Sequence, residues 1–392
     1  MACSSNDITL SGLTALQICV NDTDRSVAKG NSLFKSNSHG GGVAVYGASG
    51  HTGRFVVDEI ERRGLRAIRI GRDLQKLAAT GDAERHGPAR VARVDDEASL
   101  DAALAGAALV INCAGTFFDT AIPVIDAALR ARIPYLDVAP EQAVVRSVFA
   151  TRHDAASAAG VPVLPAAAFY GGLADLLASA LVSDADRIDS ITVAVGLDTW
   201  HPTLGTRLTG QRNTEPRVVQ HQGRLEEAAT PPPAGLWDFP EPIGRREVVL
   251  MPLSEVITLA SHLDADAIES WMNVEPLRDL RDVATPPPEP TDDARRSSQR
   301  FVMDVVVNIG GERRRASASG RDIYHVSAPI VVEAAQRLLG GDAELAGGVY
   351  ALGAIFDARS FLSALGASAM DISYATLSHP LLEKDQDQAH GE

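Results

Sequence analysis

The stretch VAVYGASGHTG, Val43 to Gly53, places three glycines three residues apart directly after a short apolar run. Glycine at such positions costs backbone entropy, so the spacing indicates that something approaches the backbone there. In a strand–turn–helix unit Gly47 permits a tight turn, Gly50 lets a pyrophosphate reach backbone N–H groups, and Gly53 lets the helix pack on the strand. The stretch therefore predicts a dinucleotide-binding turn.

The turn is followed by a regular alternation of short β-branched runs and amphipathic segments. The runs that we expect to be strands are VAVYG (43–47), RAIRIG (66–71), RVARVD (90–95), ALVINCAG (108–115), IPYLDVA (133–139) and VPVLPA (161–166). Such alternation is typical of parallel strands joined by crossover helices, and segment 119–132 shows Ile122, Ile125 and Leu129 at helical spacing. The pattern predicts an α/β fold with a Rossmann-type doubly wound parallel sheet.

After Ala168 the pattern changes to strand-like runs with little helix between them. These runs are SITVAVGLD (190–198), REVVLM (246–251), EVITLASHL (255–263), ESWMNV (269–274) and the segment 300–322. They predict a second α+β domain built on a mainly antiparallel sheet. Two proline clusters, 230–242 and 285–293, lack the N–H groups that a ladder needs, so we expect them to be surface excursions.

Helices are predicted again near the carboxyl end. Ser327 is a candidate N-cap ahead of Pro329, the run 330–339 should end at Gly340–Gly341, and ARSFLSALGA (358–367) should form a further helix. The domain boundaries that we expect are a poorly ordered extension over 1–40, an NADP-binding Rossmann domain over 41–168, a substrate and dimerisation α+β domain over 169–325, C-terminal helices packing back on the Rossmann domain over 326–380, and a frayed tail over 381–392.

The second predicted strand indicates which dinucleotide is bound. In an NAD site an acidic residue roughly 20 residues after the glycine turn binds the ribose 2′-hydroxyl, whereas in an NADP site an arginine binds the 2′-phosphate. The run IRIGRDLQKL (68–77) places Arg72 at that position, where its guanidinium can grip the phosphate and stack on adenine. The alternative is a solvated arginine at a strand end, and the neighbouring Asp73 offers an acidic group at almost the same position. We expect NADP(H) as the cofactor.

Further cofactor contacts are expected around the same crevice. Asp95 closes the third predicted strand and is a candidate acceptor for the adenine amino group. Ala114 and Gly115 end the fourth predicted strand, where small residues leave room for the nicotinamide. His51 is either a turn residue or a catalyst. The complete set of predicted cofactor-binding residues is Gly47, Ser49, Gly50, His51, Thr52, Gly53, Arg72, Asp95, Ala114 and Gly115.

These motifs resemble those of a known family. The stretches that carry the resemblance are GASGHTG (47–53), VINCAGTF (110–117), IPYLDVAPE (133–141) and AASAAGVPVLPAAAFYGGLADLLA (155–178). Together they resemble the saccharopine dehydrogenase-like reductases, a group that includes trans-acting enoyl reductases. The resemblance implies an NAD(P)-binding Rossmann domain followed by an α/β domain that shapes the substrate site. The chain departs from the family pattern at Pro140, where glycine is usual, and in AFYGG (168–172).

The proton needed beside a hydride acceptor has two candidate sources. No tyrosine is followed four residues later by lysine, so the catalytic pair of ordinary short-chain dehydrogenases is absent. Tyr170 lies where the chain leaves the nucleotide domain, and His201 lies in TWHPT (199–203) and can titrate near neutrality. We predict both as catalytic residues, with a packed aromatic and a structural histidine as the alternatives.

Four residues are candidates for the substrate site. Asp137 and Glu141 follow a predicted parallel strand at its carboxyl end, where ligands bind, with capping of the next helix as the alternative. Trp200 and Arg207 are expected to line the cleft, with Arg207 as an anchor for a carboxylate or a phosphate. Core packing and a surface ion pair are the alternatives for these two residues.

Composition limits the partners of the chain. A formal net charge of -15 disfavours nucleic acid and anionic membranes, and no apolar run approaches the roughly 18 residues of a membrane span. Three cysteines without paired spacing predict neither a disulfide framework nor a zinc site, so we expect no metal and a cytoplasmic location. Extended strands with unpaired edges favour a homodimer.

The sequence thus predicts an NADPH-dependent oxidoreductase of saccharopine dehydrogenase-like type. Its hydride would go to a C=N bond or an activated C=C bond of a small metabolite. A trans-acting enoyl reductase working on a thioester-tethered chain is one alternative. A non-catalytic NADPH-sensing regulator is the other, because it would share every cofactor feature.

Overall fold

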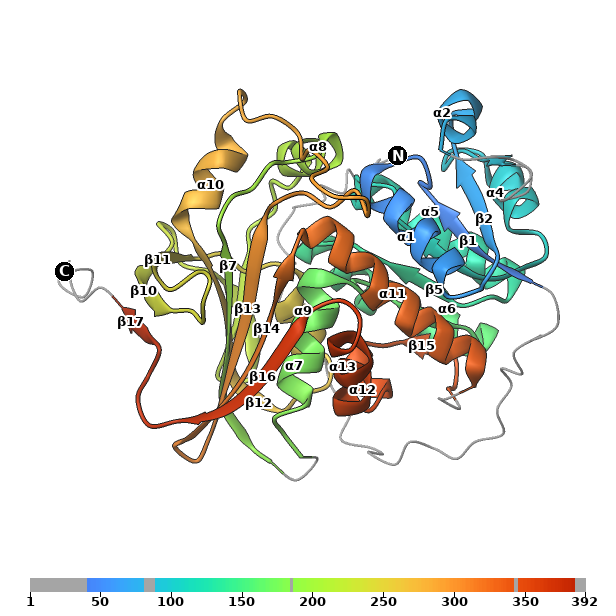
Figure 1. Cartoon of the computed structure of the whole chain (residues 1–392). Helices are drawn as coiled ribbons and strands as arrows, with labels where there is room; N and C mark the ends of the chain where they lie inside the picture. The colour runs from blue at the N-terminus through green and yellow to red at the C-terminus, as the bar shows by residue number, and fades with distance from the viewer. Residues whose placement is uncertain (1–40, 81–88, 184–185, 342–344, 385–392) are drawn as a thin grey trace, which may run out of the picture. The chain divides into compact units, whose positions relative to one another are not determined.

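The computed structural model describes residues 41–80, 89–183, 186–341 and 345–384 of the chain. The extension expected over 1–40 and most of the tail expected over 381–392 lie outside the described residues. Two sheets with their helices make up the described part (Figure 1). They are the parallel sheet and the mainly antiparallel sheet that the sequence predicts.

Seven strands of the described chain form a parallel sheet in the order β15-β6-β5-β4-β1-β2-β3. Their bounds are β1 (Gly42–Tyr46), β2 (Ala67–Gly71), β3 (Arg90–Val91), β4 (Ala107–Asn112), β5 (Tyr135–Asp137), β6 (Pro162–Leu164) and β15 (Gly348–Val349). The order reverses between β1 and β4, and doubly wound sheets bind their ligands at this switch point. The glycine turn directly follows β1, so it lies at the switch point.

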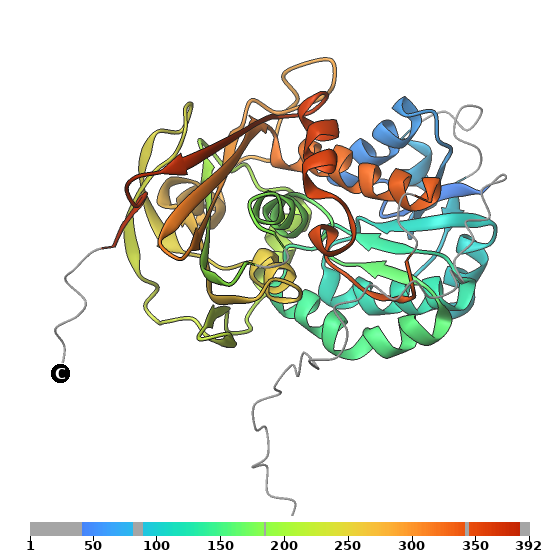
Figure 2. The same cartoon turned by 90° about the horizontal axis from the view of Figure 1, so that it is seen from below.

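Helices cover both faces of this sheet (Figure 2). On one face lie α1 (His51–Arg62), drawn in blue, and α11 (Ile323–Gly340), drawn in orange. On the other face lie α5 (Phe117–Ala131) and α6 (Gln142–Ala159). Arg63, the C-cap of α1, hydrogen-bonds Glu333 on α11, so a helix from the carboxyl end is tied to the glycine-turn helix.

The second sheet has ten strands among the described residues. Eight follow the order β16-β14-β13-β7-β12-β11-β10-β17, while β8 pairs with β12 and β9 pairs with β8. Their bounds are β7 (Ile188–Leu197), β8 (Val218–His221), β9 (Arg224–Glu227), β10 (Ala234–Asp238), β11 (Arg245–Leu250), β12 (Ala265–Asn273), β13 (Arg300–Ile309), β14 (Glu312–Arg321), β16 (Asp371–Leu377) and β17 (Leu382–Lys384). The pair β7–β12 is parallel and its neighbours are antiparallel. The predicted mainly antiparallel sheet is confirmed.

Shorter helices complete the described chain. They are α2 (Leu74–Ala78), α4 (Glu97–Leu104), the π-helix η1 (Phe169–Leu173), α7 (Ala174–Ser179), α8 (Leu204–Arg212), α9 (Ser254–Ala260), α10 (Val274–Arg281), α12 (Leu352–Ile355) and α13 (Ala358–Gly366). One hydrophobic cluster contains Val45 of β1, Val331 of α11 and Met303 of β13. A continuous apolar core therefore joins the nucleotide sheet to the second sheet.

Two strand predictions were wrong. The run EVITLASHL forms helix α9, and every residue from Ser254 to Leu259 is buried. An apolar run without a polar face has no period that distinguishes a buried helix from a buried strand. The predicted strand 90–95 is ordered as a strand only over Arg90–Val91, so Asp95 does not close it.

The start of α11 also differs from the prediction. Asp322 is its N-cap and accepts hydrogen bonds from Tyr324 N and His325 N, both at 3.0 Å. Ser327 lies inside the helix, and its hydroxyl donates to the Ile323 carbonyl at 2.8 Å. The predicted end is confirmed, because the helix stops at Gly340 with Gly341 in the left-handed conformation.

The carboxyl end contributes strands that the sequence does not predict. The two residues of β15 pair with β6 and extend the parallel sheet. Residues 382–384, expected to begin a frayed tail, form β17 and pair with β10. Segments this short carry no periodicity, and partner strands far away in the chain decide their structure.

Candidate active site

Backbone crowding at the turn explains two of its three glycines. Gly47 has φ +85°, and a Cβ atom there would lie 2.8 Å from the backbone nitrogen of Ala114. A Cβ atom on Gly53 would overlap the Gly47 carbonyl oxygen. Gly50 has φ -72°, and a Cβ there would lie 3.1 Å from the same oxygen. Close helix–strand packing thus requires Gly47 and Gly53 most strictly.

The amino-terminal end of α1 is open to an anion. Gly50 is the N-cap and offers no side-chain hydrogen bond to the first turn of this 12-residue helix. The half-buried hydroxyls of Ser49 and Thr52 have no hydrogen-bond partner within the described ranges. Free N–H groups and the helix dipole favour negative charge at such an end. These residues fit the pyrophosphate of a dinucleotide.

His51 begins α1 and lies between two aromatic rings. Its ring meets Phe55 at 5.2 Å and Tyr324 at 5.3 Å between centroids, both edge to face. Its Nε2 atom is buried and has no hydrogen-bond partner among the described residues. Burial lowers the pKa of His51, so the ring is neutral at neutral pH. His51 therefore connects the glycine turn to the start of α11 by packing.

Arg72 extends into solvent from the end of β2, without an ion pair in the part of the chain that the structure describes. Asp73 is occupied as the N-cap of α2, accepting hydrogen bonds from Gln75 N at 3.0 Å and Lys76 N at 3.1 Å. Capping of α2 therefore explains why an aspartate stands at position 73. The exposed Asp95 carboxylate forms an ion pair with Arg93 at 2.7 Å.

We expect Arg72→Ala to weaken NADPH binding by about 10- to 100-fold, because a charge-assisted hydrogen bond contributes roughly 1.5–3 kcal/mol. NADH binding should change little, since NADH lacks the 2′-phosphate. Titrating both nucleotides against nicotinamide fluorescence measures the two affinities. Arg187→Ala is the matched control, because Arg187 is an exposed arginine paired with Asp266 and is not among the predicted cofactor-binding residues. An unchanged ratio of the two affinities in Arg72→Ala would contradict the assignment.

Ala114 and Gly115 connect the turn to the second part of the molecule. Asn112 Oδ1 accepts a hydrogen bond from Ala114 N at 3.0 Å, and Thr120 donates to the Ala114 carbonyl at 2.7 Å. A Cβ atom on Gly115 would lie 3.6 Å from the hydroxyl of Thr209 on α8. Helix α8 therefore faces the crevice at the point where the nicotinamide half of a dinucleotide is expected.

Glu141 is a fully buried carboxyl group at the start of α6. It occupies the N-cap position, but its side chain makes no capping hydrogen bond. Oε1 instead accepts hydrogen bonds from Phe117 N at 3.3 Å and from the Thr209 hydroxyl at 3.1 Å. Oε2 has no partner within the described residues. Burial raises the pKa of Glu141 to about 7.

Asp137 has a structural task instead of the predicted contact with substrate. It is fully buried and accepts hydrogen bonds from the Tyr135 hydroxyl at 2.8 Å, Ala139 N at 3.0 Å and Ala166 N at 2.7 Å. Burial raises its pKa to about 6. The side chain holds together the turns that follow β5 and β6, and in this conformation a ligand has no access to it.

Tyr170 and Trp200 pack together between η1 and the segment that follows β7. Tyr170 lies on η1, and its ring stands 5.1 Å from Phe169 and 6.4 Å from Trp200. Its hydroxyl is buried without a partner in the described chain, and burial raises its pKa. Trp200 is 5% exposed and donates from Nε1 to the Tyr324 hydroxyl at 3.0 Å. Trp200 therefore stabilises this packing from within.

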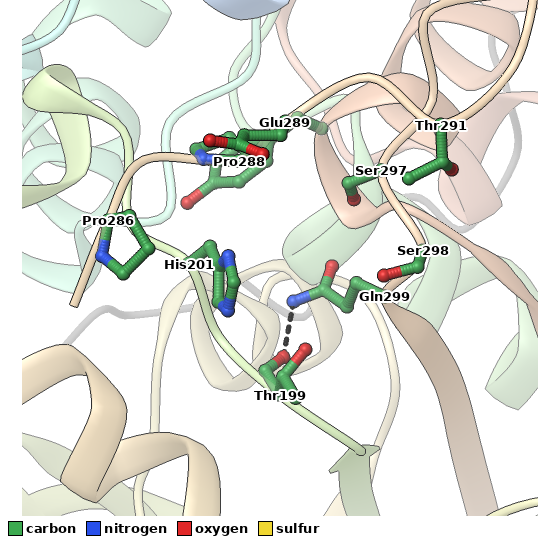
Figure 3. Close-up of a pocket in the computed structure, with 10 residues that line it drawn as sticks. Thr199, His201, Pro286, Pro288, Glu289, Thr291, Ser297, Ser298 and Gln299 are labelled. Atoms are coloured by element: carbon green, nitrogen blue, oxygen red, sulfur yellow. Dashed lines mark hydrogen bonds between the residues drawn. The ribbon is translucent and has the colours of Figure 1, made fainter.

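His201 and Arg207 contact no residue of the glycine turn in the described hydrogen bonds and cavity lining. His201 is half-buried and lines a cavity of about 200 Å³ together with Thr199, Gln299 and Tyr324 (Figure 3). Other lining residues are Pro286, Pro288, Glu289, Thr291, Ser297 and Ser298. Arg207 donates to the carbonyls of Asp282 at 3.1 Å and Thr285 at 2.6 Å. These carbonyls occupy the guanidinium that was expected to anchor an anion.

Two residues of the site were missed by the sequence analysis. Thr209 on α8 donates a hydrogen bond to Glu141. The ring of Tyr324 on α11 packs against His51 at the start of α1. The Tyr324 hydroxyl also meets Thr206 of α8 at 2.9 Å. The stretch TWHPTLGTRLTG (199–210) contains Thr206 and Thr209, but no local pattern distinguishes them from other threonines.

The described residues contain no cluster of three or more His, Cys, Asp or Glu side chains able to hold a metal ion. Among their helices, none has both the length and the apolar character needed to cross a membrane. Cys113 is a half-buried free thiol.

Comparison with known proteins places the first domain. Residues 43–164 match the family model described as saccharopine dehydrogenase NADP binding domain. Saccharopine dehydrogenase-like oxidoreductases of Rattus norvegicus and Mus musculus are 27% and 26% identical over 152 residues, which cover 34% of this chain and 35% of each relative. The chain thus spans about a third of the length of the curated relatives it matches.

A solved structure resembles a larger part of the chain. The apo histidine-tagged saccharopine dehydrogenase (L-Glu forming) from Saccharomyces cerevisiae aligns with 86% of this chain and 100% of its own, at a TM-score of 0.55 and 13% identity. At this identity the likeness shows the fold, including both the nucleotide-binding sheet and the second sheet.

Proposed function

We propose that the chain is an NADPH-dependent reductase, because residues 43–164 match the family model described as saccharopine dehydrogenase NADP binding domain. Its hydride acceptor is a C=N bond or an activated C=C bond in a small metabolite. Gly47, Gly50 and Gly53 with the start of α1 would hold the pyrophosphate, and Arg72 the 2′-phosphate. Bound NADPH would supply the hydride.

One observation supports this function most strongly. A series of residues in close contact leads from the glycine turn to α8. Gly47 abuts Ala114, and Gly115 beside it faces Thr209, whose hydroxyl donates to Glu141. A cofactor lying across the carboxyl edge of the parallel sheet would thus meet polar groups of the second domain at its reactive end. A protein that only senses NADPH needs no such polar surface.

The lining of the cavity at His201 favours a small polar acceptor over a tethered acyl chain. Hydroxyl groups of Thr199 and Ser298, the Gln299 amide and the His201 imidazole line it beside prolines (Figure 3). An acyl chain would instead gain from an apolar channel. We therefore favour the C=N bond, with the thioester-tethered enoyl chain as the second candidate.

Turnover tests this function directly. Carbonyl, imine and enoyl compounds are mixed with the full chain and NADPH, and NADPH oxidation is followed by absorbance. We expect oxidation with imines. Tyr170→Phe and His201→Ala then test the two residues that the sequence predicts as catalytic. Tight NADPH binding without oxidation across the whole panel would contradict a reductase and support the sensing role.

Oligomeric state and location are further proposals. Strand β16 ends the second sheet, pairing only with β14 among the described strands, and five of its seven residues are exposed. Unpaired edges readily recruit partners, so we propose a homodimer formed through this edge. Analytical ultracentrifugation of the full chain checks it. The cytoplasmic location rests on cysteine usage alone.

A further inference from the structure

We propose that Glu141 is the proton donor of the reaction, holding the acid proton on Oε2 and passing it to the substrate as hydride arrives. This inference rests on the proposed reductase function and names the residue that completes it. Glu141 differs from Tyr170 and His201 because its contacts lie at the carboxyl edge of the parallel sheet, on α5 and α8. The ring contacts of Tyr170 are with Phe169 and Trp200, and the cavity of His201 is lined by residues of the second domain and the start of α11.

The hydrogen bonds of Glu141 determine which oxygen carries the proton. Oε1 accepts from two donors, the Phe117 N–H group and the Thr209 hydroxyl, at 3.3 and 3.1 Å. An oxygen that already accepts two hydrogen bonds is a poor place for a proton. Oε2, buried and without a partner among the described residues, is the oxygen that bears it.

Burial and the nearby charges favour the neutral form of the Glu141 carboxyl group. Burial is the main reason that its pKa is raised, and the nearby Asp137 carboxyl raises it further. At the end of α8, Arg212 pairs with Asp119 at 2.7 Å, so the charge of that cation is already balanced. No Lys, Arg or His of the described chain forms an ion pair with Glu141. A buried carboxylate without a cation is costly, so the acid form persists.

Access to Oε2 depends on α8. This helix has no buried residue, and Leu204 and Leu208 on it are 74% and 41% exposed. Four side chains hold it. Thr206 hydrogen-bonds Tyr324, and Thr209 donates to Glu141. Arg207 donates to the carbonyls of Asp282 and Thr285, and Arg212 forms the exposed pair with Asp119. The proposal requires α8 to shift so that a substrate enters beside Gly115, and the Arg212–Asp119 pair would resist this little, because exposed ion pairs contribute little to stability. Thr209 is then a positioning residue that orients Glu141 through Oε1.

The proposed step balances in atoms and electrons. The acceptor carbon of a C=N bond gains a hydride with its electron pair from NADPH, which becomes NADP⁺. The π electrons move to nitrogen, the Oε2–H bond of Glu141 breaks, and an N–H bond forms. The resulting carboxylate regains a proton from solvent. For a conjugated C=C bond the same proton goes to the carbon beside the carbonyl group.

The first test needs no substrate. Infrared spectra of the full chain, recorded across a pH series, report protonated carboxyl groups through their carbonyl stretch. We expect a band that disappears near pH 7 in the wild type and is missing from Glu141→Gln. Glu255→Gln is the matched control, because Glu255 is another buried glutamate whose Oε2 has no partner among the described residues. If the spectrum of Glu141→Gln keeps this band, the proposal is overturned.

The second test uses the compound that the turnover screen identifies. Glu141→Gln should lower kcat/KM by about a hundred- to ten-thousand-fold, the range typical of a lost general acid, while NADPH affinity measured by fluorescence stays at the wild-type value. Turnover within tenfold of wild type in Glu141→Gln overturns this inference alone. A screen in which the wild type oxidises no NADPH overturns the proposed function, and the inference with it.

The pH dependence of activity in Thr209 variants distinguishes a proton donor at Glu141 from a purely structural carboxyl group. The Thr209 hydrogen bond lowers the pKa of Glu141, so Thr209→Val should raise it. Activity falls as the acid loses its proton, and we expect this alkaline limb to move to higher pH in Thr209→Val and to return in Thr209→Ser. An unmoved limb in Thr209→Val would contradict the geometry of the donor.

Discussion

Gly53→Ala binds NADPH at least about a hundred-fold more weakly than the wild type and is less stable by roughly 1–3 kcal/mol, the cost typical of an overpacked core. The added methyl group would overlap the Gly47 carbonyl oxygen and lie 3.0 Å from Ala48 Cα. Gly47 is itself confined by Ala114, so the turn is unable to yield. Helix α1 must then move away from β1 and take its phosphate-facing N–H groups with it.

Gly366→Ala is the control for this substitution. Gly366 ends α13, and a Cβ atom there would meet nothing within 4 Å. It should bind NADPH as the wild type does and unfold at the same or a slightly higher urea concentration, because alanine favours the helical backbone over glycine. Fluorescence titration and urea unfolding of all three proteins give both quantities. Wild-type NADPH affinity in Gly53→Ala would show that the cofactor does not lie across this turn.

Glu141→Gln gains about 3 kcal/mol of stability relative to the wild type between pH 4.5 and pH 8, as 1.36 kcal/mol per pKa unit requires. Glu141 has a folded-state pKa of about 7 against the ordinary 4.5. The folded protein therefore binds the proton more tightly than the unfolded chain does. This contribution to stability is complete below pH 4.5 and is lost as the pH rises to 7. Glutamine has no such loss.

Urea unfolding of both proteins across this pH range measures the difference. Asp137 also has a raised pKa, but it is present in both proteins, so its effect cancels in the comparison. Glu255→Gln serves as the control, because burial also raises the pKa of Glu255. It shows how much a second buried carboxyl group changes the free energy of unfolding with pH. Parallel stability curves for wild type and Glu141→Gln would mean that Glu141 titrates normally in the folded protein.

Local sequence patterns predicted the parts of the fold that local physics determines. Three glycines between a strand and a helix, Gly341 after α11 and the alternation from Val43 to Ala168 each have a reason within a few residues. Helix α9 was mistaken for a strand because it is buried on all sides, and β15 was missed because its only cause is the distant β6. Tertiary contacts decide such segments.

The candidate site divides in the same way. Arg72 could be named because strand ends have a fixed place relative to the glycine turn, and Asp73 is explained by the helix that it caps. Arg207 and Trp200 have the right chemistry, but the structure uses them to hold the 282–285 segment and Tyr324. The environment of Glu141 was beyond prediction, since Thr209 lies 68 residues further along the chain.

The most direct test of the account is one pair of titrations on the wild-type chain, with NADPH and with NADH, followed by nicotinamide fluorescence. The account predicts saturable binding of NADPH in the micromolar range or tighter, with NADH weaker by about 10- to 100-fold because Arg72 has no 2′-phosphate to bind. No saturable signal with NADPH, or equal affinity for the two nucleotides, would contradict it.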